Sequence, residues 1–301
     1  MQVDTFLKIP DWGRPAAGPG TPEASAGRQT ALALLRLIVW LTILSYVQDL
    51  RPGARLVFTI VWISAFLWRY AYSAWSEPPA ARGSKTRLGQ ELPLSLPKHL
   101  IPHIAILALL VACSLPWSGA FFTGGCANPG WYESVWKERA LSAQHSGYFI
   151  ALSLLADTAT FPLVEEFTFR GWLLVAWTRK LGPAWAVILT SAVFAVGHFT
   201  PSPGLLVSHF VFGLLLALAV LGTNSLWSAF AMHYAYNFAN DVMTIYPVHG
   251  FFANLFRMRV FRCDTSGLMV ALSVALMLAI ILAARRANTD DSKAVLRKVD
   301  A

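Results

Sequence analysis

Charged residues are scarce in this chain. Asp, Glu, Lys and Arg together make up only 13% of its 301 residues, whereas hydrophobic residues make up 56%. A soluble domain usually contains about 25% charged residues. The composition therefore excludes an ordinary soluble protein. It indicates a membrane protein, because several apolar runs of roughly 20 residues are long enough to cross a bilayer.

Other features are also missing. The chain has three cysteines and no CxxC pair, which excludes a cysteine-rich zinc site or a disulfide scaffold. We expect no cleavable signal peptide, because residues 1–29 are polar and rich in Gly, Pro and Ala and predict a disordered tail. The net charge of +8 comes without a basic reading motif, so we expect no nucleic-acid partner.

The apolar runs predict an all-α membrane protein with about eight transmembrane helices. We place these spans at residues 30–48, 54–73, 100–117, 147–177, 184–200, 204–221, 225–244 and 265–284. The membrane domain then covers residues 30–284, and residues 285–301 form a C-terminal tail. Pro162 lies inside the long fourth span and predicts a kink just before Glu165, because proline lacks the N–H of a regular helical turn.

The distribution of Lys and Arg predicts the orientation. About twice as many of them fall in loops on the side of the two termini as on the other side, which favours cytoplasmic termini. Arg257, Arg259 and Arg262 favour the opposite orientation. Cys126 and Cys263 fall in loops on the predicted outer side, where a disulfide could join them in an oxidising compartment; two free thiols are the alternative.

The most unusual stretch of the chain is Glu165-Glu166-Phe167-Thr168-Phe169-Arg170 in the fourth span. Each charge at bilayer depth costs about 2.5–3.5 kcal/mol, so such groups pair or have a function. Glu166 and Arg170 are four residues apart and share a helix face, which predicts an ion pair. Glu165 points away from that pair and would keep an environment of its own, as a general acid or base needs. The alternative is a buried ion pair with a spare acid facing a water-filled cavity.

Two further polar motifs follow at helical spacing. His198 ends the fifth span, four residues after Phe194, and His233 and Asn237 share a face of the seventh. An imidazole and an amide side by side are suited to stabilising an oxyanion. The alternatives are a histidine at a helix end and ordinary interhelical hydrogen bonds. At about 1.5 Å per residue, the three spans bring these residues and Glu165 to similar depths.

Four other polar residues in apolar surroundings are weaker candidates for catalysis, because each lacks a comparable partner on its own helix. We do not expect them to take part directly in catalysis. They are Arg36, Arg69, Asp157 and His209.

Together the three motifs resemble those of the CPBP family, which comprises the type II CAAX prenyl endopeptidases and related bacteriocin-processing and immunity proteins. The motifs are EExxxR at Glu165, Glu166 and Arg170, FxxxH at Phe194 and His198, and HxxxN at His233 and Asn237. The resemblance implies an intramembrane endopeptidase whose catalytic core covers residues 146–243. Its active site would lie between the fourth, fifth and seventh helices, with Glu166 and Arg170 in a supporting role.

The resemblance also implies a role for each catalytic position. Glu165 and His198 would activate a water molecule, and His233 and Asn237 would stabilise the oxyanion. The substrate would be a membrane-anchored protein or peptide, cut near its terminus at the bacterial inner membrane. We expect no cofactor, since these residues suffice without metal and no HExxH is present. The alternative is a metalloprotease in which Glu165, His198 and His233 hold zinc with an open fourth position.

Two other classes of function compete with a protease. A non-catalytic membrane immunity or assembly factor could retain the same residues. A proton-coupled transporter also buries acids and histidines, but such transporters often show a repeat and paired broken helices, which we do not find in this sequence.

Overall fold

The computed structural model describes residues 57–58, 61, 94, 96–123, 158–198, 202–245 and 263–299. All of the regular structure in these ranges is helical, with no strand, which agrees with the predicted all-α class. A helix that includes residues 158–166 runs into the helical segments η3 and α8 without a break. The elements are η2 (Lys98–Leu100), α5 (Ile101–Thr123), η3 (Phe167–Leu173), α8 (Leu174–Leu181), α9 (Pro183–Gly197), α10 (Pro203–Thr223), α11 (Leu226–Ile245) and α13 (Cys263–Val299).

Three of the described helices contain segments that are long and apolar enough to cross a membrane. These segments are Lys98–Leu115, Pro203–Thr223 and Gly267–Asp291, and α9 is a shorter apolar helix. The predicted third and fifth to eighth spans coincide with α5, α9, α10, α11 and α13. The first two predicted spans lie almost wholly outside the described residues.

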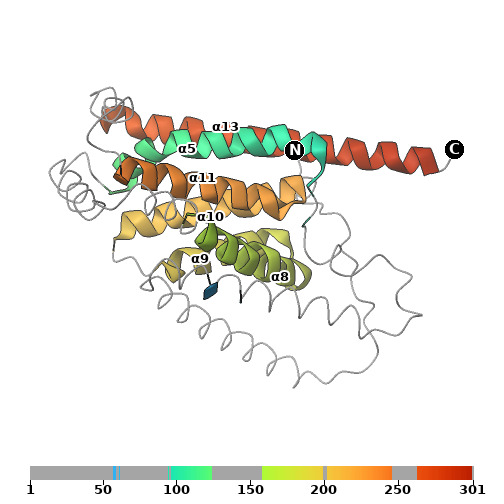
Figure 1. Ribbon diagram of the computed structural model, residues 1–301, viewed down its shortest axis with the longest axis horizontal. Helices are drawn as coiled ribbons and strands as arrows, with labels where there is room; N and C mark the ends of the chain where they lie inside the picture. Colours follow the sequence, from blue (N-terminus) through green and yellow to red (C-terminus); the bar gives the residue numbers. More distant parts are fainter. Residues whose placement is uncertain are drawn as a thin grey trace, which may run out of the picture.

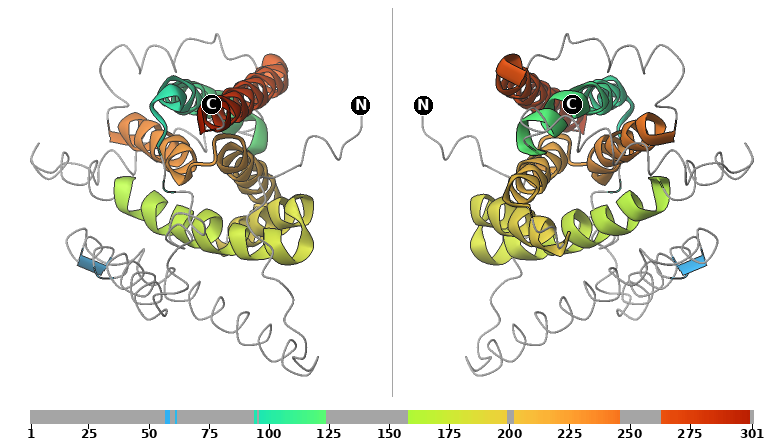
Figure 2. Two further views of the ribbon diagram at one scale, coloured as in Figure 1. Left: turned by 90° about the vertical axis from the view of Figure 1, so that its right-hand side faces the viewer. Right: turned by 90° about the vertical axis from the view of Figure 1, so that its left-hand side faces the viewer.

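The helices pack side by side (Figure 1). α5 packs against both α13 and α11, while α10 contacts α9, α11 and α13. The end view in Figure 2 shows α5 and α13 on one side of the bundle and η3, α8 and α9 on the other, with α10 between them. α13 continues as one helix through most of the predicted C-terminal tail, to Val299.

A tight turn joins α8 to α9. Gly182 has a φ of 80°, a left-handed conformation that glycine adopts without steric cost. Pro183 begins α9 at a position where its missing N–H has no helical partner to lose. The two helices pack against each other, and Arg170 and Phe194 are equally far from Gly182 along the chain. The turn therefore brings the EExxxR and FxxxH motifs to the same depth.

A second turn joins α10 to α11 in the same way. Asn224 is left-handed, with φ of 50°, a conformation that asparagine tolerates better than most residues. The Thr223 hydroxyl donates to the Ala219 carbonyl, 2.8 Å away, and lies 2.9 Å from the Ser228 hydroxyl. These side chains satisfy polar groups where one helix ends and the next begins.

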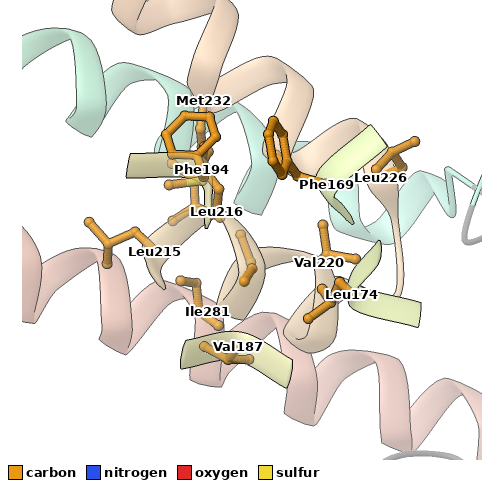
Figure 3. Close-up of a cluster of buried hydrophobic side chains, with 14 of the residues drawn as sticks. Phe169, Leu174, Val187, Phe194, Leu215, Leu216, Val220, Leu226, Met232 and Ile281 are labelled. Atoms are coloured by element: carbon orange, nitrogen blue, oxygen red, sulfur yellow. The ribbon is translucent and has the colours of Figure 1, made fainter. Parts of the chain in front are cut away.

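The core is built around α10. Leu216 and Val220 of this helix are fully buried, and Phe194 and Met232 reach the same cluster from α9 and α11 (Figure 3). The largest fully buried side chain is nevertheless a charged one, Arg170. The candidate site therefore lies within the core of the bundle.

Candidate active site

The EExxxR motif crosses a change of helix type. Glu165 and Glu166 end the α-helical part, and Phe167–Leu173, which includes Arg170, forms a π-helix. π-Helical turns are rare and are frequent at functional sites. Residues 158–166 are helical through Pro162, and the departure from α geometry begins after Glu166. The kink predicted at Pro162 stays a prediction.

Glu166 accepts hydrogen bonds from two cationic or potentially cationic groups. Arg170 Nη1 lies 3.0 Å from Glu166 Oε1, and His233 Nδ1 lies 2.8 Å from the same oxygen. The side chains of Glu166 and Arg170 are 0% exposed, so water cannot replace either partner. The predicted Glu166–Arg170 pair is confirmed, and it extends to a residue of α11.

Arg170 also makes contacts with α9 and α10. Its Nη2 donates to the carbonyl of Gly213 on α10 at 3.3 Å, and its guanidinium carbon lies 4.3 Å from the centre of the Phe194 ring. A methyl group on Gly213 would approach the Ser191 backbone of α9 to 3.1 Å. Glycine therefore lets α9 and α10 come close, and this brings the Gly213 carbonyl within reach of the arginine. A cation on an aromatic face is stabilised further when both are desolvated.

His233 lies between the two glutamates. Its Nδ1 bonds to Glu166, and its Nε2 lies 3.8 Å from Oε2 of Glu165. The prediction that Glu165 keeps a separate environment is therefore wrong in one respect, because both carboxylates contact the same imidazole. Adjacent helical residues point about 100° apart, but an imidazole carries its two nitrogens on different edges and can meet both.

His198 reaches this group through Phe194. It is the first residue after α9, and its Nδ1 lies 2.8 Å from the carbonyl oxygen of Phe194. A carbonyl only accepts, so Nδ1 carries a proton, and in the neutral imidazole Nε2 then has the lone pair. The Phe194 ring contacts both histidines, with centres 4.6 Å from His198 and 5.8 Å from His233.

Asn237 lies one turn beyond His233 on α11 and is partly buried. Its side chain forms no hydrogen bond with the other residues that the structure describes. An unengaged amide is available to a ligand, whereas a structural amide at this depth would be expected to have a partner. This arrangement is compatible with the predicted donor role and does not test it.

Two site residues had no clear signature in the sequence. His209 of α10, which received a low rank, stacks on His198 with ring centres 4.1 Å apart and planes inclined by 19°. Phe212 meets His233 edge-on, with centres 5.5 Å apart. Both contacts cross between helices, so the spacing within one helix could not reveal them. Of the other low-ranked residues, Arg36, Arg69 and Asp157 lie outside the described part of the chain.

The zinc alternative requires Glu165, His198 and His233 to converge. Among the described residues no three His, Cys, Asp or Glu side chains are grouped as metal ligands. In each histidine Nδ1 is hydrogen-bonded, to Glu166 in His233 and to the Phe194 carbonyl in His198. Such a bond is also usual for a histidine that binds metal through its other nitrogen, so it does not decide between the two mechanisms. The choice between the glutamate and the zinc mechanism therefore stays a prediction.

The part of the chain that contains the three motifs matches a known protein family. Residues 147–239 match the sequence model described as "Type II CAAX prenyl endopeptidase Rce1-like". This segment is an Rce1-like domain. The finding confirms the resemblance to the CPBP family, and the domain contains all three motifs. No curated protein and no solved structure shows significant similarity to the chain.

The Rce1-like domain covers about a third of the chain and includes the Gly182 and Asn224 turns. The domain is similar to the CAAX-type protease family, and its apolar helices, with α5 and α13 outside it, indicate an integral membrane protein. The charged cluster therefore belongs to the domain itself, and α5 and α13 pack on α10 and α11 from outside it.

Proposed function

We propose that the protein is an intramembrane endopeptidase of the CAAX type, in which Glu165, His198, His233 and Asn237 are catalytic. The observation that carries the proposal is the buried group formed by Glu165, Glu166, Arg170 and His233 inside an Rce1-like domain. Several ionisable groups at this depth are costly and are kept for a function or for each other.

In this mechanism Glu165 and His198 activate the attacking water. Nε2 of His198 is the free basic nitrogen, since Nδ1 donates to the Phe194 carbonyl. Oε2 of Glu165 accepts no hydrogen bond from the described residues and so has a lone pair available. The water oxygen attacks the peptide carbonyl carbon, its proton passes to one of these two groups, and that group returns a proton to the leaving nitrogen.

His233 and Asn237 would donate to the oxyanion. Nε2 of His233 is a donor only in the imidazolium form, because the hydrogen bond to Glu166 already uses the Nδ1 proton. With two carboxylates and one guanidinium nearby, an imidazolium makes the total charge of the four groups zero. A neutral group of buried charges is less costly than one with a net charge. Each well-placed oxyanion donor contributes about 2.7–4 kcal/mol.

The proposal also covers the membrane topology, the location and the substrate class. We infer about eight membrane spans and cytoplasmic termini in a bacterial inner membrane, from apolar length and the loop distribution of Lys and Arg. The substrate class is a membrane-anchored protein or peptide cut near its terminus. The glutamate mechanism is preferred to the zinc alternative because the sequence has no HExxH motif and the proposed catalytic residues suffice without metal.

The test compares the ends of membrane proteins in three strains. One expresses the wild type, one Glu165→Ala, and one Asp290→Asn, a control that removes an exposed carboxylate of α13. Membranes are isolated, and terminal peptides are identified by mass spectrometry. We expect one or a few membrane proteins to be shortened in the wild type and control but full-length with Glu165→Ala.

Two outcomes would overturn the proposal. Identical protein ends in all three strains would favour a non-catalytic immunity or assembly factor. Normal cleavage by a Glu165→Ala protein, expressed at the wild-type level, would show that this carboxylate is not the base.

A further inference from the structure

His198 has an unusual position for a residue that must orient a nitrogen accurately. It follows the last residue of α9, so no later turn of that helix can pack against it. The rotation about the bond that joins an imidazole to its Cβ is broad and has no sharp minimum. Contacts from outside the residue must therefore set the plane of the ring.

The described hydrogen bond and aromatic contacts of this ring come from two residues. Phe194 supplies the carbonyl that accepts the Nδ1 proton and an aromatic ring that meets His198 at 63°. The other aromatic contact is with His209, which stacks face to face on His198 with ring centres 4.1 Å apart and ring planes inclined by 19°. That separation is shorter than the roughly 4.5–7 Å usual for aromatic pairs. His209 is thus the group that holds the ring face of His198.

We propose that His209 is a positioning residue for catalysis. Its ring clamps the His198 imidazole in the plane in which Nδ1 meets the Phe194 carbonyl, and this keeps Nε2 aimed at the reacting water. The proposal rests on the proposed function for the role of His198. The arrangement of the two rings can also be tested without any substrate.

α10 is a suitable helix to hold His209 against His198. It begins at Pro203, and the hydroxyl of the preceding Ser202 accepts from the Leu205 N–H. Farther along, the same helix supplies the Gly213 carbonyl to Arg170 and Phe212 to His233. A single rigid helix therefore contacts both imidazoles and the arginine, so a change at position 209 should affect His198 while the contacts of Arg170 and His233 persist.

The first experiment observes His198 directly. Protein labelled with ¹⁵N-histidine is placed in lipid nanodiscs, and two-bond ¹H–¹⁵N correlations distinguish a proton on Nδ1 from one on Nε2. The chain has seven histidines, few enough to assign His198 from the signal lost in His198→Gln. Four proteins are compared, namely the wild type, His209→Phe, His209→Leu and the control His103→Leu, which removes a histidine of α5.

We expect the wild type, His209→Phe and His103→Leu to show one His198 form with the proton on Nδ1. Phenylalanine keeps a flat aromatic face, whereas leucine fills the space without one. His209→Leu should therefore split or broaden the His198 signals as its ring samples other orientations. If His209→Leu does not fold, His209→Ala replaces it. Unchanged His198 signals in the folded leucine or alanine variant would overturn the proposal.

The second experiment measures cleavage of a membrane protein identified by its shortened terminus in the three-strain comparison. We expect His209→Leu to lower kcat roughly 10- to 100-fold with little change in KM, since small misplacements of a catalytic group have effects of this size. His209→Phe should restore most of the rate. Wild-type kcat in His209→Leu would refute the clamp and leave the protease assignment intact. Absence of cleavage by the wild type itself would instead refute the protease assignment.

Discussion

Glu166 and Glu165 are adjacent, yet the structure gives them different roles in stability. One oxygen of Glu166 accepts from Arg170 at 3.0 Å and lies 2.8 Å from Nδ1 of His233. Glu166→Gln keeps the shape of the side chain and removes its charge. Arg170 is then left 0% exposed without its bonded counter-ion. Breaking one side of a buried ion pair typically costs about 3–5 kcal/mol.

Glu165→Gln provides the matched comparison. Oε2 of Glu165 lies 3.8 Å from His233 Nε2, too far for a hydrogen bond, and it has no hydrogen-bond partner among the described residues. We expect this change to cost about 1 kcal/mol or less, since the net contribution of even a formed hydrogen bond is of that order. It should nevertheless abolish cleavage, because the proposed base is lost.

The measurement is thermal unfolding in nanodiscs, followed by the fluorescence of the 12 tryptophans at one scan rate. A loss of 1 kcal/mol shifts Tm by roughly 2–4 °C in a domain of 150–250 residues. Glu166→Gln should therefore lower Tm by on the order of 10 °C and Glu165→Gln by a few degrees at most. Adding Arg170→Met to Glu166→Gln should recover part of the loss, because it removes the uncompensated charge. A larger Tm loss for Glu165→Gln than for Glu166→Gln would refute this division of roles.

Three further predictions concern catalysis, metal and topology. His198→Ala and His233→Ala should each abolish cleavage while the protein stays folded in the membrane; retained cleavage by either would remove that histidine from the mechanism. The purified enzyme should stay active after chelator treatment and hold no stoichiometric zinc, and activity that is lost with chelator and restored by zinc would establish the metalloprotease alternative. A membrane-impermeant thiol reagent should label Cys126 and Cys263 in intact cells only after reduction if they form a disulfide. Labelling without reduction would exclude the disulfide, and no labelling even after reduction would contradict the predicted orientation. The structure does not describe Cys126 or the side chain of Cys263.

The sequence by itself determined what depends on composition and on spacing within one helix. Low charge and long apolar runs determined the class of protein, and the positions of α5, α9, α10, α11 and α13 agree with predicted spans. The Glu166–Arg170 pair was also predictable, because residues four apart share a helix face whatever the surroundings. The three motifs identified the family of residues 147–239.

Only the tertiary structure decided which groups meet across helices. His233 bonds to Glu166 and also lies near Glu165, and His198 stacks on His209. A helix that is apolar on nearly every face does not reveal which face turns inward. Its rotation and its shift along its neighbours follow from side-chain packing, from the turns at Gly182 and Asn224, and from close approaches such as that at Gly213. The π-helical turn that includes Arg170 was likewise not predicted from the sequence, and the contacts of this arginine with Gly213 and Phe194 cross to other helices. For these reasons the sequence predicted the catalytic candidates one helix at a time, and packing decided how they are joined.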